Sequence, residues 1–84
     1  MYFVYFLKLR NGNIYKGSTS DLNRRLTEHR SAQVFSTKSY LPLKLIGYEV
    51  YYLKSDAERR ERFLKTTEGR RLLNQQYRDI IKES

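Results

Sequence analysis

We expect an α+β fold for this chain: a small three-stranded antiparallel sheet flanked by helices, in the order β-β-α-β-α-α. An aromatic and β-branched run at 2–7, a turn at Asn11-Gly12 and a second extended stretch predict a β-hairpin. A third strand-like run covers 43–53, and the other segments carry apolar residues at helical spacing. With 84 residues, the chain has room for one domain and a modest core, so we assign residues 1–84 to a single domain.

The turn of the predicted hairpin allows two registers. A two-residue turn at Asn11-Gly12 pairs Leu9 with Ile14 and places Tyr5 and Tyr15 on opposite faces of the sheet. A three-residue loop, which adds Asn13, pairs Leu9 with Tyr15 and places both tyrosines on one face.

A helix should follow the hairpin. Each of the three hydroxyl residues at 18–20 can cap its start, and Leu22 and Leu26 mark its apolar face. Arg25 and His29 are four residues apart, so they lie one above the other on the helix surface.

The polar segment at 30–42 predicts a surface loop, and its hydroxyls and Lys38 are suited to contact phosphate oxygens. The run at 43–53 has apolar side chains on both faces of a strand. That pattern is expected where helices cover a sheet from both sides or where a strand is central.

Two further helices are predicted in the C-terminal third. Ser55 and Glu58 form a capping-box pattern for a helix that runs to about Lys65, and Glu61 lies on the shoulder of its apolar face, which is formed by Ala57, Arg60, Phe63 and Leu64. Thr66 or Thr67 can cap the last helix. Its repeat comprises Leu72, Leu73, Gln76, Tyr77, Ile80 and Ile81.

The composition favours a nucleic-acid partner. The net charge is +8 and the pI is near 9.9, which suits a polyanion, and eight Tyr and four Phe residues can stack on bases or pack in the core. Without cysteine there is no disulfide framework, and one His leaves no structural zinc site. No apolar run approaches the roughly 20 residues of a membrane span, and Met1 enters a strand with no basic leader, so we expect a cytoplasmic protein.

Six residues carry a resemblance to a known family. Val4-Tyr5 stands at the end of a first motif, Tyr15-Lys16-Gly17 forms a second, and Arg25 follows Tyr15 by ten positions, with His29 and Glu61 further on. In this ordered set the chain resembles the GIY-YIG nuclease superfamily, in particular its small free-standing bacterial members. Two positions depart from the family pattern: Phe3 replaces a glycine, and Lys16 replaces an apolar residue.

The resemblance implies a metal-dependent endonuclease that hydrolyses phosphodiester bonds in DNA, in repair or processing, and it implies that Tyr5 and Tyr15 both face the site. We therefore favour the longer hairpin loop. The planar fork of Arg25 suits a phosphate, and the Glu61 carboxylate suits one Mg²⁺ or Mn²⁺ ion. The resemblance assigns the metal to Glu61 and the general base to Tyr15. Tyrosine is intrinsically a poor base, so His29 is an alternative proton acceptor, and Tyr5 could hold the water or His29.

The main alternative is a noncatalytic DNA- or RNA-binding module of the same fold. That module would keep Tyr5 and Tyr15 for packing or base stacking. An alternative reading of two single residues makes Arg25 a surface arginine like Arg24, and pairs Glu61 with Arg60, Arg62 or Lys65 on its own helix. For either reading we expect DNA more than RNA as the partner. The predicted nucleic-acid contacts are Lys16, Lys38, Arg59, Arg60, Arg62, Arg70 and Arg71, with Asn74 as a weaker candidate.

Overall fold

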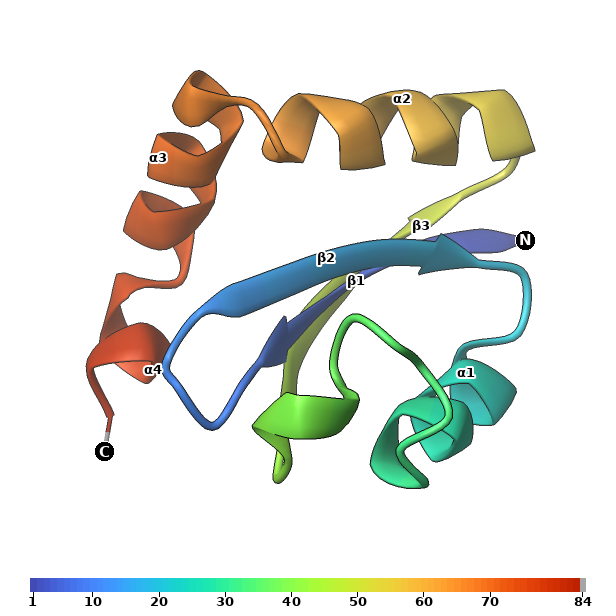
Figure 1. Ribbon diagram of the computed structural model, residues 1–84. Helices are drawn as coiled ribbons and strands as arrows, with labels where there is room; N and C mark the ends of the chain where they lie inside the picture. Colours follow the sequence, from blue (N-terminus) through green and yellow to red (C-terminus); the bar gives the residue numbers. More distant parts are fainter. Residues whose placement is uncertain (84) are drawn as a thin grey trace.

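The computed structural model describes residues 1–83 and contains one three-stranded antiparallel sheet. Its strands are β1 (Tyr2–Lys8), β2 (Ile14–Thr19) and β3 (Lys44–Tyr51), in the spatial order β2-β1-β3 (Figure 1). The expected fold class is therefore confirmed. β1 is the central strand, and β2 forms an edge.

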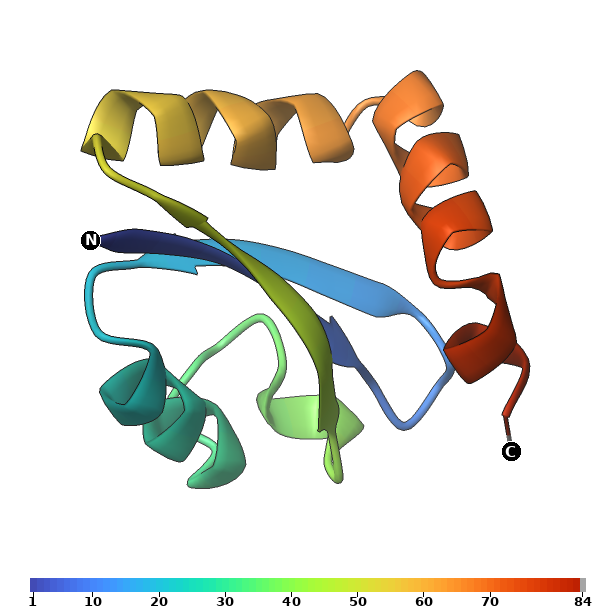
Figure 2. The same cartoon turned by 180° about the vertical axis from the view of Figure 1, so that it is seen from behind.

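Helices cover both faces of this sheet. α1 (Leu22–Arg30) and the short 3-10 helix η1 (Lys38–Tyr40) lie on one side, and α2 (Lys54–Leu64) lies on the other (Figures 1 and 2). α3 (Thr67–Gln76) follows α2 at a steep angle, and α4 (Arg78–Lys82) ends beside the hairpin turn. None of the helices in residues 1–83 is long and apolar enough to span a membrane.

β1 divides the core into two layers because its side chains alternate between the faces. Val4 and Phe6 point toward α2 and α3, where the buried partners are Ala57, Leu64 and Leu73. On the other face Tyr5 and Leu7 pack with Leu9 and Leu26. A fully buried side chain of this size contributes roughly 1.5–3 kcal/mol, so β1 anchors both helical layers.

The hairpin adopts a register that neither predicted turn gives. Its loop comprises Arg10, Asn11 and Gly12, and Leu9 lies opposite Asn13, because the amide of Leu9 donates to the Asn13 carbonyl at 2.9 Å. The Asn11 side chain accepts from the Asn13 amide at 3.0 Å, and Gly12 takes a φ of 90°, which closes the turn one residue early.

Tyr5 and Tyr15 nevertheless lie on the same face of the sheet, as expected. Tyr5 lies opposite Gly17 and Tyr15 opposite Leu7, so both tyrosines point to the α1 side of the sheet. The loop has the favoured length of three residues, but it comprises 10–12 and not 11–13.

Two predictions about the middle of the chain were wrong in part. β3 is an edge strand rather than a buried one, since Tyr48 and Val50 are about half exposed, and it is shorter than 43–53. The segment at 30–42 is not wholly a surface loop, because two of its own residues, Val34 and Thr37, are buried.

The predicted caps of the first two helices were also wrong. Asp21 caps α1 by accepting from the Arg24 amide, because β2 continues through 18 and 19. α2 begins at Lys54 after an extended Leu53, so Ser55 lies inside the first turn and no capping box forms. Thr66 caps α3 as expected, accepting from the Gly69 amide at 3.1 Å.

The C-terminal helical repeat is interrupted at Tyr77, which separates α3 from α4. The Tyr77 ring lies over Gly47 of β3, where a Cβ atom would come closer than 3.0 Å to it. Packing against the sheet therefore decides where the helix ends. Phe63 and Leu72, expected on buried faces, are about 40% exposed, whereas Leu64 and Leu73 are fully buried.

Candidate functional site

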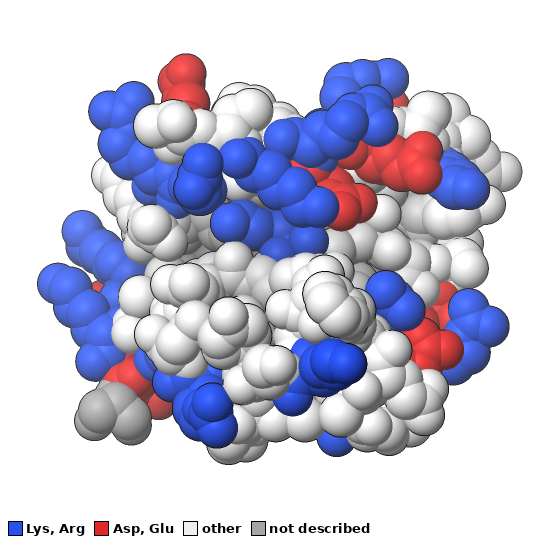
Figure 3. All heavy atoms as spheres, viewed as in Figure 1, with Lys and Arg blue, Asp and Glu red and all other residues white. Residues whose placement is uncertain are grey.

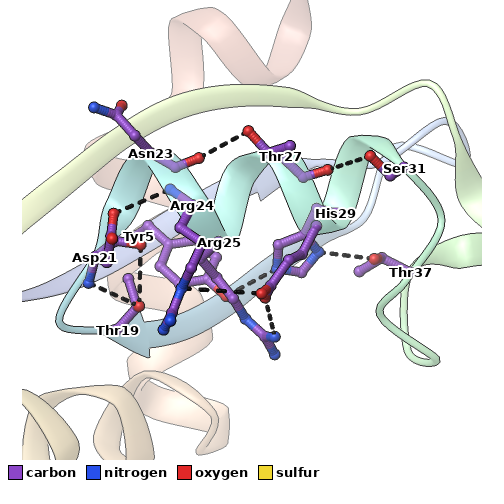
Figure 4. A network of polar contacts seen from close by, with 11 residues as sticks. Tyr5, Thr19, Asp21, Asn23, Arg24, Arg25, Thr27, His29, Ser31 and Thr37 are labelled. Carbon is purple, nitrogen blue, oxygen red and sulfur yellow. Dashed lines mark hydrogen bonds and ion pairs between the residues drawn. The ribbon is translucent and has the colours of Figure 1, made fainter.

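A buried chain of polar groups lies between β1, α1 and the segment before η1. The Tyr5 hydroxyl is 2.9 Å from Nε2 of His29, and Nδ1 of His29 is 2.8 Å from the Thr37 hydroxyl (Figure 4). Tyr5 is 1% exposed, and His29 and Thr37 are fully buried. Both ring nitrogens of His29 are therefore engaged by the protein.

Burial determines the protonation states of the hydrogen-bonded side chains Tyr5 and His29. It lowers the pKa of His29 to about 4, and the nearby Arg25 charge acts in the same direction, so the imidazole is neutral at pH 7. Burial also raises the pKa of Tyr5 to about 12, against the effect of Arg25, so the phenol keeps its proton. In a neutral imidazole one ring nitrogen donates and the other accepts, and each hydroxyl can take the complementary role, so both bonds can form at the same time.

Tyr15 lies beside this chain and is only partly buried. Its ring centroid is 5.2 Å from that of His29 and 6.3 Å from that of Tyr5. Gly17 is needed in the same strand, because a Cβ atom there would fall closer than 3.0 Å to the Tyr5 hydroxyl. The two motif residues Tyr15 and Gly17 thus leave room for Tyr5 and set the aromatic wall of the site.

Arg25 projects from α1 toward the tyrosines and is about one-third exposed. Its Nη1 donates to Oε1 of Glu28 at 2.9 Å. The pKa of Arg25 is raised by this bond first and then by Tyr5 and Tyr15, so the guanidinium is permanently charged. One carboxylate orients the group, and the rest of its donor fork remains available to an anion.

Glu61 reaches the same strand from the opposite face of the sheet. The Ser18 hydroxyl donates to its Oε1 at 2.5 Å, and Lys65 donates to its Oε2 at 2.8 Å. The negative charge of Glu61 also makes a small contribution to the raised pKa of the Tyr5 phenol. Glu61 thus lies near the cluster and also makes the intrahelical pair that the alternative reading expected.

A cleft of about 430 Å³ connects the two faces at the end of β2. Ser18 and Arg25 line it together with Glu28, Ala57 and Glu58. β2 is the edge strand, so groups from α1 and α2 meet around it without a further strand between them and solvent. The arrangement can present a cation and a carboxylate to a ligand along this edge.

The donor set at Glu61 fits one hard divalent cation. Within residues 1–83, no group of three or more His, Cys, Asp or Glu side chains could enclose a metal. Mg²⁺ usually keeps several waters and uses one or two carboxylates, which a single Glu61 can supply. The Lys65 side chain is 53% exposed, and such a pair is worth roughly 0–1 kcal/mol, so an ion can displace the ammonium at little cost.

The basic residues divide according to whether a carboxylate holds them. Arg59 pairs with Asp56 at 2.8 Å, and Arg60 donates to both oxygens of Glu49 on β3 at 3.0 and 3.2 Å. Lys38 is exposed, with its ammonium 5.0 Å from the Phe35 ring centroid. In the described part of the chain, no carboxylate pairs with Lys16, Arg62, Arg70 or Arg71.

Basic side chains form a band on one face of the molecule. Figure 3 shows this band running from α3 toward α2 and the β2 edge, with acidic side chains at its end. Arg60 instead points toward β3, so of the predicted contacts it is the one held by an ion pair on the far edge of the sheet.

Sequence reasoning missed the residues that support the cluster. Ser18 was assigned to a helix cap and Thr37 to a phosphate-binding loop, whereas Ser18 bonds to Glu61 and Thr37 to His29. The spacing of Arg25 and Glu28, three residues apart on a helix, was a signal that could have revealed their pair. No local pattern reveals Thr37, because its contact depends on how the loop folds over α1.

Comparison with known proteins identifies the family. The sequence model described as "GIY-YIG catalytic domain" matches residues 1–76. The chain belongs to the GIY-YIG family. The UPF0213 proteins of Staphylococcus aureus strains Mu3 and Mu50 are each 38% identical to it over 66 residues, which cover 77% of this chain and 80% of theirs. No solved structure gives a significant match.

Membership makes the chain a nuclease-type domain with nucleic acid as its substrate class, and nucleases of this family generally depend on a divalent metal. Each of the two departures from the GIY-YIG pattern has its own surroundings in the sheet. Phe3 packs edge-on against Tyr48 of β3, with ring centroids 6.0 Å apart. Lys16 lies opposite Phe6 and faces the α2 and α3 side of the sheet.

Proposed function

We propose that this GIY-YIG domain is a metal-dependent endonuclease that hydrolyses phosphodiester bonds in DNA, with a role in DNA repair or processing. The observation that supports the proposal is one cleft at the end of β2, lined by Arg25 and by Ser18. Ser18 bonds to Glu61, and Tyr15 lies within the electrostatic reach of Arg25. These groups supply the three requirements of the reaction: a phosphate clamp, a proton acceptor and a carboxylate for a metal.

Arg25 binds the scissile phosphate. Its guanidinium is oriented by Glu28 and keeps donors free for two nonbridging oxygens. The negative charge on those oxygens increases as the water adds, so Arg25 stabilises the transition state more than the ground state.

Tyr15 accepts the proton of the attacking water. The water oxygen forms a bond to phosphorus, its proton passes to the Tyr15 oxygen, and the P–O3′ bond breaks, which leaves a 5′-phosphate and a 3′-hydroxyl that is reprotonated by solvent. Arg25 lies close enough to Tyr15 for their charges to interact, so both groups can act on one bound phosphate.

Glu61 would hold one Mg²⁺ or Mn²⁺ ion, which would supply positive charge to offset the negative charge that develops on the departing oxygen. Ser18 orients the carboxylate by donating to one of its oxygens. His29 does not contact substrate: it fixes the position of Tyr5, which in turn packs against Tyr15.

The test is cleavage of labelled single-stranded, duplex and branched DNA, and of matched RNA, with Mg²⁺ or with a chelator. Glu61→Gln should abolish metal-dependent cleavage and leave binding equal or slightly tighter, because it removes the metal's charged ligand and one negative charge. Glu68→Gln removes an exposed carboxylate on α3 as a matched control and should cut normally. Arg25→Ala should weaken both steps.

Cleavage by Glu61→Gln at the wild-type rate in saturating Mg²⁺ would exclude Glu61 as the metal ligand. Metal-independent binding without cleavage of any substrate would favour the noncatalytic binding module instead.

A further inference from the structure

Lys16 occupies a position that the catalytic arrangement does not explain. It stands between Tyr15 and Gly17, but the strand alternation turns its side chain to the opposite face from Tyr15. There it lines a second cleft of about 470 Å³, beside the hairpin turn, together with Arg70 and Asn74 of α3. This cleft is separate from the one that Arg25 lines.

Two positive side chains, Lys16 and Arg70, line this cleft, and Lys65 is close enough to act on Lys16. Partial burial lowers the pKa of Lys16, and the nearby charges of Arg70 and then Lys65 lower it further. Within residues 1–83, neither Lys16 nor Arg70 has a carboxylate partner, and Lys65 is shared with Glu61. Like charges held together without counterions destabilise a folded chain, and a bound anion removes that cost.

The position of the cleft identifies the anion. Lys16 and Ser18 are two residues apart on the same face of β2, a rise of about 6.6 Å. A nucleic-acid strand carries a phosphate for about every 3.4 Å of helix axis, so the cleft lies one or two nucleotides from a phosphate held beside Ser18 and Glu61. The free edge of β2 connects the two positions.

We propose that Lys16 and Arg70, assisted by Lys65, form a second phosphate subsite that binds the backbone of the cleaved strand one or two nucleotides to one side of the scissile phosphate. The inference rests on the proposed function for the location of the cut. The subsite gives a role to Lys16, which replaces the apolar residue of the family's second motif. It also means that the substrate must extend by at least one or two nucleotides on one side of the scissile phosphate.

The experiment combines protein variants with substrates in which a single phosphate is replaced by a neutral methylphosphonate, at each position flanking the cut. In the wild type, the neutral linkage one or two nucleotides to one side should weaken binding about 3- to 10-fold. In Lys16→Gln and in Arg70→Gln the same linkage should cause a smaller loss, because one of its two contacts is already absent, and in the double variant it should cause little further loss. Lys44→Gln on β3 and Arg78→Gln on α4 are matched controls that remove exposed charges elsewhere.

Equal sensitivity of the wild type and Lys16→Gln to every neutral linkage would overturn the subsite. Lys16→Arg should restore binding, which separates the lost charge from a fault in folding. If the wild type cuts no substrate, the proposed function fails but the subsite is still tested by binding: the salt slope should fall by about 0.7–0.9 for each of Lys16→Gln and Arg70→Gln. Slopes equal to those of the two control variants would then overturn the subsite.

Discussion

The single histidine makes the pH dependence of folding a direct test of the buried polar chain. The folded pKa of His29 is about 4, against an ordinary value of 6.5, because burial and Arg25 disfavour the imidazolium. The unfolded chain therefore binds more protons between pH 6.5 and pH 4. The stabilising contribution is complete above pH 6.5 and is lost as the pH falls toward 4.

The size of the effect follows from the shift. A difference of about 2.5 pKa units corresponds to about 3 kcal/mol at 1.36 kcal/mol per unit. About 2 kcal/mol of this should already be lost at pH 5, where most carboxylates have not begun to titrate. A domain of this length has a total stability of about 4–13 kcal/mol, so the change is large enough to measure.

Urea unfolding at pH 7, 6, 5 and 4 measures the loss in the wild type and in His29→Gln. The variant is less stable at pH 7, because glutamine does not reproduce both bonds of the imidazole, but it has no group that titrates between pH 7 and 5. The stability gap between the two proteins should therefore narrow by about 2 kcal/mol from pH 7 to pH 5. Parallel declines over this range would mean that His29 is not held neutral by its surroundings.

Three further substitutions test single contacts at the site. Tyr15→Phe should abolish cleavage while leaving the unfolding midpoint nearly unchanged, since the ring stays and only the hydroxyl is lost; wild-type turnover by this variant would remove Tyr15 as the base. Thr37→Val keeps the shape but leaves Nδ1 of His29 unpaired, and should cost about 1–3 kcal/mol in urea unfolding, whereas a change below 0.5 kcal/mol would contradict the bond. Gly17→Ala should destabilise by about 1–3 kcal/mol, because its Cβ overlaps the Tyr5 ring, and an unaffected thermal midpoint would show that the ring can move.

The fold was predictable because its determinants are local. The aromatic run of β1, the positive φ of Gly12 in the hairpin loop and the threonine cap of α3 each act through neighbouring residues, and each formed. The hairpin register was not predictable to the residue, since the Asn11 side chain competes for the Asn13 amide and shifts the loop.

The candidate site was predictable only as a set of residue types at fixed spacings. The sequence indicated Arg25, His29 and Glu61, but it could not indicate Thr37 or Ser18 as their partners, because those contacts join segments 8 and 43 residues apart. The break at Tyr77 has the same cause: the helical repeat continues through it, and only the approach to Gly47 of β3 ends the helix.

The enclosure of His29 is the reason why we propose Tyr15 rather than His29 as the proton acceptor. An imidazole with no exposed surface and with both nitrogens bonded has no lone pair for the attacking water, although its ordinary pKa suits a base better than that of a phenol. To act as the base, His29 would have to break its bond with Tyr5 and admit solvent. Tyr15 needs no such opening, since it is partly exposed and lies within the field of Arg25. The geometry therefore favours Tyr15 as the acceptor and gives His29 the task of holding Tyr5 in place against it.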